Sequence, residues 1–152
     1  MTDLHDRVEA DLRTAMKARD KATTSALRMV VAALKNTATA EGLGPQGRLD
    51  DAAVQKVLAT EVKRRREAAA AFAEAGRTES AASEEAEAEV YAAYLPAQLS
   101  DDEVTAIVDQ VIADTGASGP QDLGQVMKAA MAATRGQADG SRVSAIAKAR
   151  LT

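Results

Sequence analysis

Hydrophobic residues recur at helical spacing along the first two thirds of the chain, and this pattern predicts four helices before Pro96. The first spans about residues 2–20, with Thr2 or Asp3 as its N-cap, and the second begins at about Lys21. The third begins at Asp50 or Asp51, and the fourth runs from about Glu79 to Tyr94. Their apolar positions are Leu4, Val8, Leu12 and Met16; Leu27, Val30, Val31 and Leu34; Val54, Leu58, Val62, Ala69 and Phe72; and Val90, Tyr91, Tyr94 and Leu95.

Three shorter helices are predicted after Pro96. Ser100 and Glu103 have the spacing of a capping box, which opens a helix that Gly116 ends. The next helix carries Leu123, Val126, Met127, Ala130 and Met131, and Gly136 is expected to cap it. The last helix follows the segment Gln137–Asp139, with Asp139 or Ser141 as its N-cap. An acidic cap would occupy the anion site that a bare helix N-terminus offers, so we do not expect this turn to cradle a phosphate.

Breaks and composition set the fold class. The segment Gly42–Arg48 holds three glycines and a proline and reads as a loop, Gly76 fits a helix C-cap, and Pro96 stops the fourth helix. The chain has 36 alanines, one Phe, two Tyr and no Trp, so residues that favour strands are scarce. We therefore expect an all-α protein, with a four-helix N-terminal domain over residues 1–96 and a small three-helix domain over 97–152.

Charge and cysteine usage narrow the class of protein. The 152 residues carry a net charge of −4, yet local charge decides whether a protein binds nucleic acid. There is no cysteine, and no segment approaches the roughly 20 apolar residues of a membrane span. No signal peptide is recognised either, so we expect a cytoplasmic protein that does not contact a membrane.

Candidates for catalysis are few. His5 is the one histidine, and we expect it to be a mobile surface residue beside Asp6. No phosphate-binding P-loop segment is present. The acidic run Asp101–Glu103 is explained by the preference of a helix N-terminus for acids, not by a metal. We therefore assign no catalytic residue, no metal site and no cofactor.

Two basic features stand out. The run Lys63–Glu67 lies in the middle of the third helix, where three adjacent arginines spread around the circumference, so we expect a solvated face with a Glu61–Arg65 pair. The glutamates of the fourth helix, at 84, 85, 87 and 89, are expected to be solvated as well. The second feature is a charge asymmetry: residues 96–127 hold six acids and no base, whereas residues 128–152 hold five bases and only Asp139.

The helical wheel of the last helix separates one of these five bases, Arg150, from the candidate phosphate contacts. Val143, Ile146, Ala147 and Leu151 face the core, and Arg150 falls among them as a cation that caps the helix C-terminus. The remaining four are candidate phosphate contacts: Lys128, Arg135, Arg142 and Lys148. This part of the chain has no aromatic residue to stack bases, so recognition of the shape and backbone of a folded RNA is the compatible mode.

Several segments resemble the GatB/YqeY family in the right order along the whole chain. They are DLRTAMKARDK (11–21), LRMVVAALKN (27–36), YLPAQLSDDEV (94–104), DLGQVMKAAM (122–131) and GQADGSRV (136–143). The chain departs from the family pattern at Ala145, Ala147 and Ala149, where family members commonly keep bulkier aliphatic residues. The second domain is similar to the tail of the B subunit of the glutamine-dependent aminoacyl-tRNA amidotransferase.

The resemblance implies a tRNA-binding accessory of that amidotransferase or of translation, labelled by analogy with carbon–nitrogen ligases. The ATP-dependent part of the enzyme lies in a domain that this chain lacks, so fold alone does not imply activity. Partners would be tRNA or another structured RNA and an amidotransferase or translation-related protein. The alternatives are a protein-interaction adaptor, built on the Ala/Glu-rich fourth helix, and an amidotransferase active in its own right. A DNA-binding helix-turn-helix is disfavoured, because only Arg142 would reach base edges.

Overall fold

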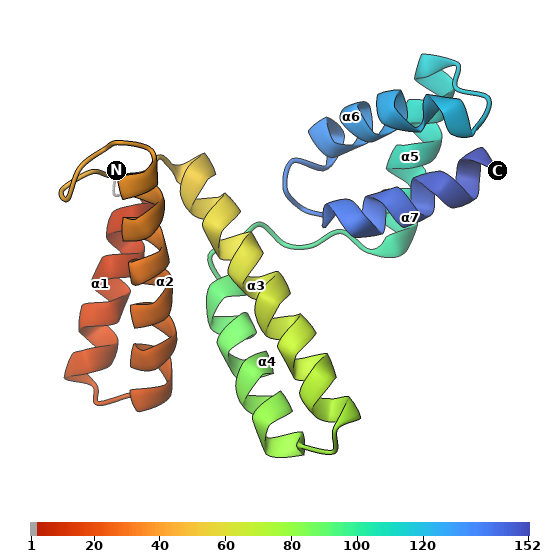
Figure 1. Ribbon diagram of the computed structural model, residues 1–152. Helices are drawn as coiled ribbons and strands as arrows, with labels where there is room; N and C mark the ends of the chain where they lie inside the picture. The colour runs from red at the N-terminus through yellow and green to blue at the C-terminus, as the bar shows by residue number, and fades with distance from the viewer. Residues whose placement is uncertain (1–2) are drawn as a thin grey trace. The chain divides into compact units, whose positions relative to one another are not determined.

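The computed structural model describes residues 3–152, and within that range every regular element is helical, as predicted (Figure 1). The elements are α1 (Leu4–Lys17), α2 (Lys21–Ala40), α3 (Asp51–Glu74), α4 (Thr78–Ala92), α5 (Asp101–Thr115), the 3₁₀ helix η1 (Pro120–Asp122), α6 (Leu123–Thr134) and α7 (Gly140–Leu151). Thr2, one of the two predicted N-caps of the first helix, lies outside the described residues. Asp3, the other, caps α1 by accepting a hydrogen bond from the Asp6 amide.

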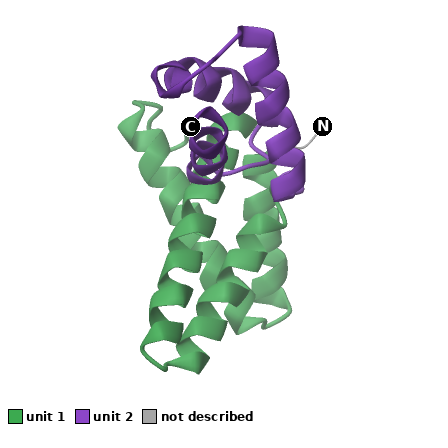
Figure 2. Cartoon of the chain, turned by 90° about the vertical axis from the view of Figure 1, so that its right-hand side faces the viewer, with its two compact units in different colours: residues 1–95 green, residues 96–152 purple. Residues whose placement is uncertain are grey.

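The chain divides into two compact units, which we call unit 1 (up to Leu95) and unit 2 (from Pro96) (Figure 2). Unit 1 contains two helical hairpins, α1–α2 and α3–α4, and unit 2 contains α5, η1, α6 and α7. Each unit has its own cluster of buried hydrophobic residues.

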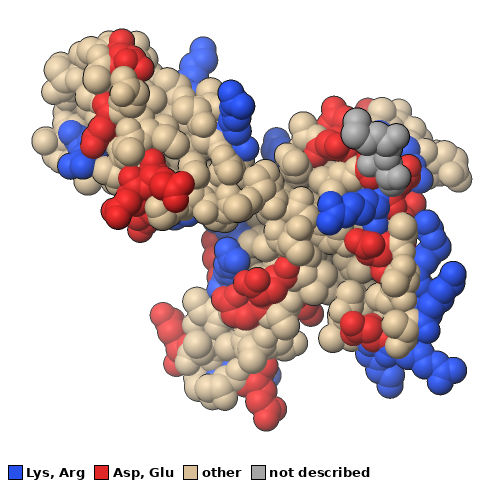
Figure 3. Space-filling model, turned by 180° about the vertical axis from the view of Figure 1, so that it is seen from behind, with Lys and Arg blue, Asp and Glu red and all other residues tan. Residues whose placement is uncertain are grey.

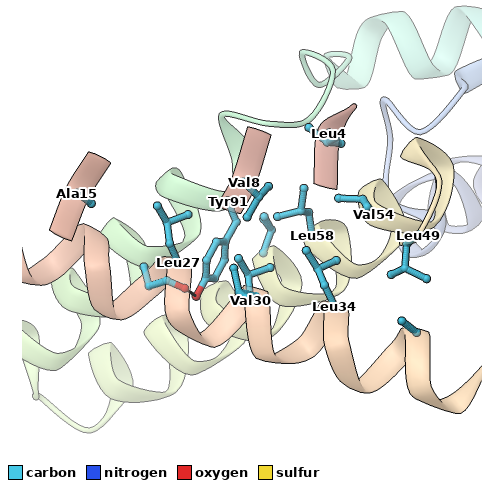
Figure 4. Packing of buried hydrophobic residues seen from close by; sticks show 14 residues of the cluster. Leu4, Val8, Ala15, Leu27, Val30, Leu34, Leu49, Val54, Leu58 and Tyr91 are labelled. Atoms are coloured by element: carbon cyan, nitrogen blue, oxygen red, sulfur yellow. Dashed lines mark hydrogen bonds between the residues drawn. The ribbon is translucent and has the colours of Figure 1, made fainter. Parts of the chain in front are cut away.

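The core of unit 1 is aliphatic and centres on one tyrosine (Figure 4). The ring of Tyr91 comes from α4 and packs among Leu27 and Val30 of α2 and Val8 of α1, all of them 1% exposed or less. Val54 and Leu58 of α3 are fully buried beside them. The predicted apolar stripe of α2 and the first part of that of α3, up to Val62, therefore face this core, whereas Ala69 and Phe72 of the predicted α3 stripe lie outside it.

Two residues of α1, Met16 and His5, differ from the sequence-based expectation. Met16 was predicted on the buried stripe but is 47% exposed. Steps of four residues drift by about 40° each on an α-helix, so the third step from Leu4 has turned about 120° away from the core. Ala15, eleven residues after Leu4, returns to the core face and is buried.

His5 was predicted to be a mobile surface residue and is instead buried, with 2% of its surface exposed. Its Nδ1 accepts a hydrogen bond from the Leu49 amide at 3.2 Å, and its Nε2 lies 3.6 Å from the Glu9 carboxylate. Leu49 is itself buried in the segment before α3, where its N–H needs an acceptor that water does not supply. The histidine therefore fastens the start of α1 to the end of the α2–α3 loop.

The arginine run on α3 was predicted to be a solvated face, and that prediction is wrong for Arg65; Arg64 and Arg66 are exposed, as predicted. Arg65 is 21% exposed and lies 3.3 Å from Glu84, 3.7 Å from Glu87 and 3.9 Å from Glu61. Arg66 reaches Glu85 and Glu89 at 4.0 and 3.5 Å. The glutamates of α4 thus form an ionic seam with α3, in which Glu84 and Glu87 are partly buried, against the expectation, and Glu85 and Glu89 are exposed, as expected. The reason is that alanines line the hairpin, so the long side chains at its edges meet across it.

Unit 2 packs three helices around small aliphatic residues. Val104 and Val108 of α5, Val126 and Ala130 of α6, and Val143 and Ala147 of α7 have no exposed surface. The capping box of Ser100 and Glu103 opens α5, and Gly116 ends it with φ of 71°, both as predicted. In the part of the chain that the structure describes, no helix is long and apolar enough to cross a membrane.

Candidate nucleic-acid interface

Unit 2 separates its charges by element. The acids lie mainly on α5 and in the segment that leads to α6, whereas the five bases lie on α6, at its end and on α7. Two of these bases cross to α5. Arg150 binds Asp109 through two nitrogens at 3.1 Å each, and Arg142 lies 2.9 Å from Asp101 through its Nε. Part of the predicted basic face is therefore neutralised within the unit.

Arg142 is the candidate residue whose surroundings differ most from the expectation. Besides Asp101, its guanidinium donates a hydrogen bond to the carbonyl oxygen of Leu99, and 34% of its side chain is exposed. These contacts tie the start of α7 to the chain just before α5. The wheel of α7 placed Arg142 beside the core face but carried no information about the segment that it meets.

Arg150 was predicted to fall among the core-facing residues of α7. It is instead 49% exposed and forms an ion pair with Asp109, whose side chain is equally exposed. Val143, Ala147 and Leu151 alone form the buried stripe there, with Ile146 partly buried. Their aliphatic side chains fill the space against α5, so Arg150 lies at the edge of the interface.

Three of the four candidates remain available. Lys128, Arg135 and Lys148 are all exposed, and none of them forms an ion pair within residues 3–152. Lys128 projects from α6 on the side away from the buried Val126 and Ala130, and Lys148 belongs to the last turn of α7. They leave the α6–α7 hairpin with three charges that no acid of the described chain offsets by an ion pair.

Arg135 has an unusual backbone. It is the C-cap of α6 and adopts the left-handed conformation, with φ of 49° and ψ of 44°; Gly136, the predicted cap, follows with φ of 78°. The left-handed region costs a side-chain-bearing residue roughly 1 kcal/mol or more, which is why glycine dominates such caps. An arginine at this position therefore carries a backbone cost that glycine would avoid.

The turn that presents Arg135 is fixed by hydrogen bonds. The Gln137 carbonyl accepts from the Leu99 amide at 2.8 Å, and the Gln137 side-chain amide donates to the Ala97 carbonyl at 3.2 Å. Thr134, the residue before Arg135, is fully buried. The segments on both sides of the arginine are thus held in place, and its side chain extends from a rigid turn.

The N-cap residue of α7 is an acid, as the sequence predicted, although its side chain makes no capping hydrogen bond to the helix amides. Asp139 is the N-cap residue, and its carboxylate accepts a hydrogen bond from the Ser141 hydroxyl. Because this carboxylate carries the same charge as a phosphate, an anion gains nothing at this helix end. Any phosphate contact must come from the side chains around the turn.

Groups that would support catalysis do not gather in this region. Among residues 3–152, no three His, Cys, Asp or Glu side chains are placed to hold a metal ion. His5 belongs to unit 1, where Leu49 and Glu9 surround its ring.

The sequence-based reasoning missed a second gathering of bases, on the α1–α2 hairpin of unit 1. Between residues 13 and 35 the chain carries six bases and one acid, Asp20. Figure 3 shows Lys and Arg side chains along the outer edge of this hairpin, at the lower right. The charge imbalance is readable in the sequence, but the net charge of the unit conceals it.

Comparison with known families gives one match. Residues 5–151 match the model of a family described as Yqey-like protein, which covers nearly the whole chain. A search of curated proteins finds no match.

Proposed function

Since the chain belongs to the YqeY-like family, we propose that it binds structured RNA, tRNA in the first place, through the α6–α7 hairpin. In this proposal it acts as an accessory related to glutamine-dependent aminoacyl-tRNA amidotransferases and has no catalytic centre of its own. The relation to the amidotransferase tail rests on the resemblance of the second domain, residues 97–152.

One observation carries the proposal: Arg135, exposed and without an ion pair in the described chain, holds a left-handed backbone where glycine is favoured. Strained residues persist where their side chains serve a purpose that a cheaper residue would not. Lys128 and Lys148 add two exposed charges on the helices that flank the turn. Cations without acidic partners neutralise phosphates and release the counterions around them.

The mode of binding follows from what the hairpin offers. Unit 2 contains no aromatic residue, so unstacked bases find no platform. Arg142, the one candidate for reading base edges, is bound to Leu99 and Asp101. Recognition therefore rests on the backbone and shape of a folded RNA, not on its sequence.

A filter-binding titration with unfractionated tRNA tests the proposal. We compare the wild-type chain, the variant K128Q/R135Q/K148Q and the control K56Q/K63Q/R64Q. The control also removes two lysines and one arginine, but from exposed positions on α3. Binding by the wild type should weaken with salt. The α6–α7 variant should lower the slope of log K against log salt by about 1 for each phosphate that is no longer neutralised.

The control should bind tRNA as the wild type does. Equal retention of tRNA by all three proteins would remove the α6–α7 hairpin from the interface. Failure of the wild type to retain tRNA at low salt would overturn the function as a whole.

The adaptor alternative has less structural support. It rests on the scarcity of bulky residues on α4; against it, Arg65 and Arg66 pair with four glutamates of that helix, although Glu85 and Glu89 remain exposed. Amidotransferase activity of the isolated chain is tested by a glutamine- and ATP-dependent assay on misacylated tRNA, in which turnover would contradict the accessory role.

The proposal includes a cytoplasmic location, an amidotransferase or translation factor as protein partner, and residues 1–96 and 97–152 as the two domains.

A further inference from the structure

The α1–α2 hairpin of unit 1 bears a set of bases that we call the hairpin cations. They are Arg13, Lys17, Arg19, Lys21, Arg28 and Lys35. All six are exposed, and none forms an ion pair within the described part of the chain. The hairpin is the segment where Figure 3 shows blue side chains along the edge of the molecule.

The acids of the same hairpin are already engaged elsewhere. Asp6 and Glu9 bind Arg48 at 2.6 and 2.9 Å, Asp11 accepts a hydrogen bond from the Tyr94 hydroxyl, and Asp20 caps α2 through the Thr23 amide. The pKa of Glu9 shows the effect: partial burial raises it, but the hydrogen bond and charge of Arg48, with a smaller contribution from the charge of Lys35, leave it lowered. The hairpin cations therefore face solvent without an ion pair in the described chain, and Lys35 alone of them adds its charge to the field at Glu9.

The cations on α2 form a line. Lys21, Ser25, Arg28, Ala32 and Lys35 follow one another at spacings of four, three, four and three residues, and all five are exposed. Such spacing keeps them on one face, over a length of about 21 Å at 1.5 Å per residue. A line of charge of this length matches a phosphate backbone better than it matches a single small anion.

At its turn the hairpin is hollowed. A shallow depression of about 560 Å³ lies between the end of α1 and the start of α2. Its lining includes Met16, Arg19, Lys21, Ser25, Arg28 and Met29. Three of the hairpin cations thus border one concave surface, and two exposed methionines supply an adaptable apolar floor.

Arg19 repeats the feature seen at Arg135. The Asp20 amide donates to the Ala15 carbonyl and the Arg19 amide to the Met16 carbonyl, so Arg19 lies at the position after a helix end where glycine is usual. Its φ is 58°. At the ends of α2, α3 and α5 the left-handed residue is Gly42, Gly76 or Gly116. Among the described residues with positive φ, the two that are not glycine are both exposed arginines at hairpin turns.

We propose that the hairpin cations form a second RNA-binding surface, on unit 1, which holds the phosphate backbone of a duplex segment of a folded RNA. The inference rests on the proposed RNA-binding function and adds a surface that the family match does not assign. A duplex is the occupant that fits, because residues 13–35 contain no aromatic side chain for stacking single-stranded bases. The depression itself has a mainly apolar lining, but six exposed bases and a single acid lie between residues 13 and 35, and this charge favours a polyanion over a protein partner.

The test measures binding to a blunt RNA duplex of about 16 base pairs, the length that double-stranded-RNA domains span, with single-stranded oligouridine of equal length as comparison. The variant K21Q/R28Q removes one lysine and one arginine from the line on α2. The control K63Q/R64Q removes the same pair from α3. K128Q/R135Q/K148Q reports on unit 2. Fluorescence anisotropy is recorded over a range of KCl concentrations, and circular dichroism checks that each variant is folded.

The expected result is that wild type binds the duplex more tightly than oligouridine. K21Q/R28Q should weaken duplex binding about tenfold at low salt and lower the salt slope by about 2, whereas K63Q/R64Q should match wild type. If K21Q/R28Q binds like K63Q/R64Q while K128Q/R135Q/K148Q weakens binding, the inference fails and the proposed function stands.

If only K21Q/R28Q weakens binding, the inference stands and the assignment of the function to α6–α7 fails. If wild type binds neither RNA, both fail, and an acidic protein segment becomes the occupant to test.

Two substitutions at one position separate a binding role of Arg19 from a structural one. Arg19→Gly should relieve the left-handed backbone and raise the melting temperature, yet weaken duplex binding. Arg19→Ala should weaken binding without raising the melting temperature. Unchanged duplex binding in both variants would exclude Arg19 from the surface.

Discussion

The hydroxyl group of Tyr91 donates a hydrogen bond of 2.7 Å to the carbonyl oxygen of Ala26, and both residues are fully buried. The bond joins α4 to α2, and the ring around it packs against α1 (Figure 4). One aromatic residue therefore connects the two hairpins of unit 1. In a chain with 36 alanines and three aromatic residues, this position concentrates stability that larger cores spread over many side chains.

Replacing Tyr91 by Phe should test the polar half of this contact. The variant keeps the ring and removes one buried hydrogen bond, which lowers the free energy of unfolding by about 1 kcal/mol. Tyr91→Ala removes the ring as well and should cost about 3 to 5 kcal/mol. Urea unfolding followed by circular dichroism measures both. A Tyr91→Phe variant as stable as wild type would mean that the hydroxyl contributes nothing net.

Alkaline titration should show that the Tyr91 hydroxyl is buried. Burial, together with the charges of Glu87 and Glu61, raises the pKa of Tyr91 to about 12. In the unfolded chain a tyrosine ionises near pH 10, as about 10 is the ordinary value. Above that pH the unfolded state releases its proton first, so the free energy of unfolding falls between about pH 10 and pH 12. Phenolate absorbance that rises near pH 10 while the helices remain intact would contradict this.

The ionic seam between α3 and α4 gives a third prediction. Arg65→Gln leaves the partly buried Glu61, Glu84 and Glu87 without their common cation, and should lower the free energy of unfolding by about 2 kcal/mol. The matched control is Arg64→Gln, because Arg64 is 64% exposed and should change stability by less than about 0.5 kcal/mol.

The pH dependence of Arg65→Gln follows from Glu87. Burial and the nearby Glu84 raise the pKa of Glu87, and Arg65 opposes that rise. Without the arginine, the charged form of Glu87 is disfavoured further. The loss of stability should therefore be largest at neutral pH and shrink as the pH falls through the carboxyl range, because protonation removes the repulsion. Urea midpoints compared at neutral and acidic pH measure this, and a pH-independent loss would argue for packing instead.

Arg135 allows stability and binding to be separated. Arg135→Gly should raise the free energy of unfolding by about 0.5 to 1 kcal/mol, because relief of the left-handed strain exceeds the entropy that glycine adds to the unfolded chain. Arg135→Ala removes the same charge but keeps the strain. Both variants should weaken tRNA binding to a similar extent, and only the glycine variant should melt at a higher temperature.

Arg142 should behave in the opposite manner. Its guanidinium holds the Leu99 carbonyl and the Asp101 carboxylate, so Arg142→Gln should lower the melting temperature of unit 2. Binding to tRNA should change less than in Arg135→Ala, because the charge is already neutralised. A stable Arg142→Gln variant that no longer binds tRNA would return this residue to the interface.

The sequence predicted what depends on neighbours along the chain. The cap at Ser100, the glycines at 76 and 116 and the starts of α2 and α3 follow from local hydrogen-bonding and backbone preferences, and the structure confirms them. What it did not predict depends on distant partners. His5 is buried by a loop 44 residues away, and Arg65 is occupied by a glutamate 19 residues later.

The candidate site shows the same division. Exposure of Lys148 followed from the helical wheel, whereas the contact of Arg142 with a segment 43 residues earlier did not. The left-handed backbone of Arg135 escaped prediction because Gly136, its neighbour, satisfies the same rule for helix ends.

The α3–α4 hairpin extends past the hydrophobic core of its unit. Beyond Arg65 and Glu84, the side chains toward the turn at Gly76 are mostly exposed alanines and polar residues, with Phe72 only partly buried. Backbone amides there open to solvent without disturbing Tyr91 or the core around it, so the hairpin unfolds locally from its tip. Hydrogen exchange should therefore be fastest near Gly76 and slow stepwise toward Leu58. This gradient in exchange rate would run along two continuous helices, neither of which has a break where the rate changes.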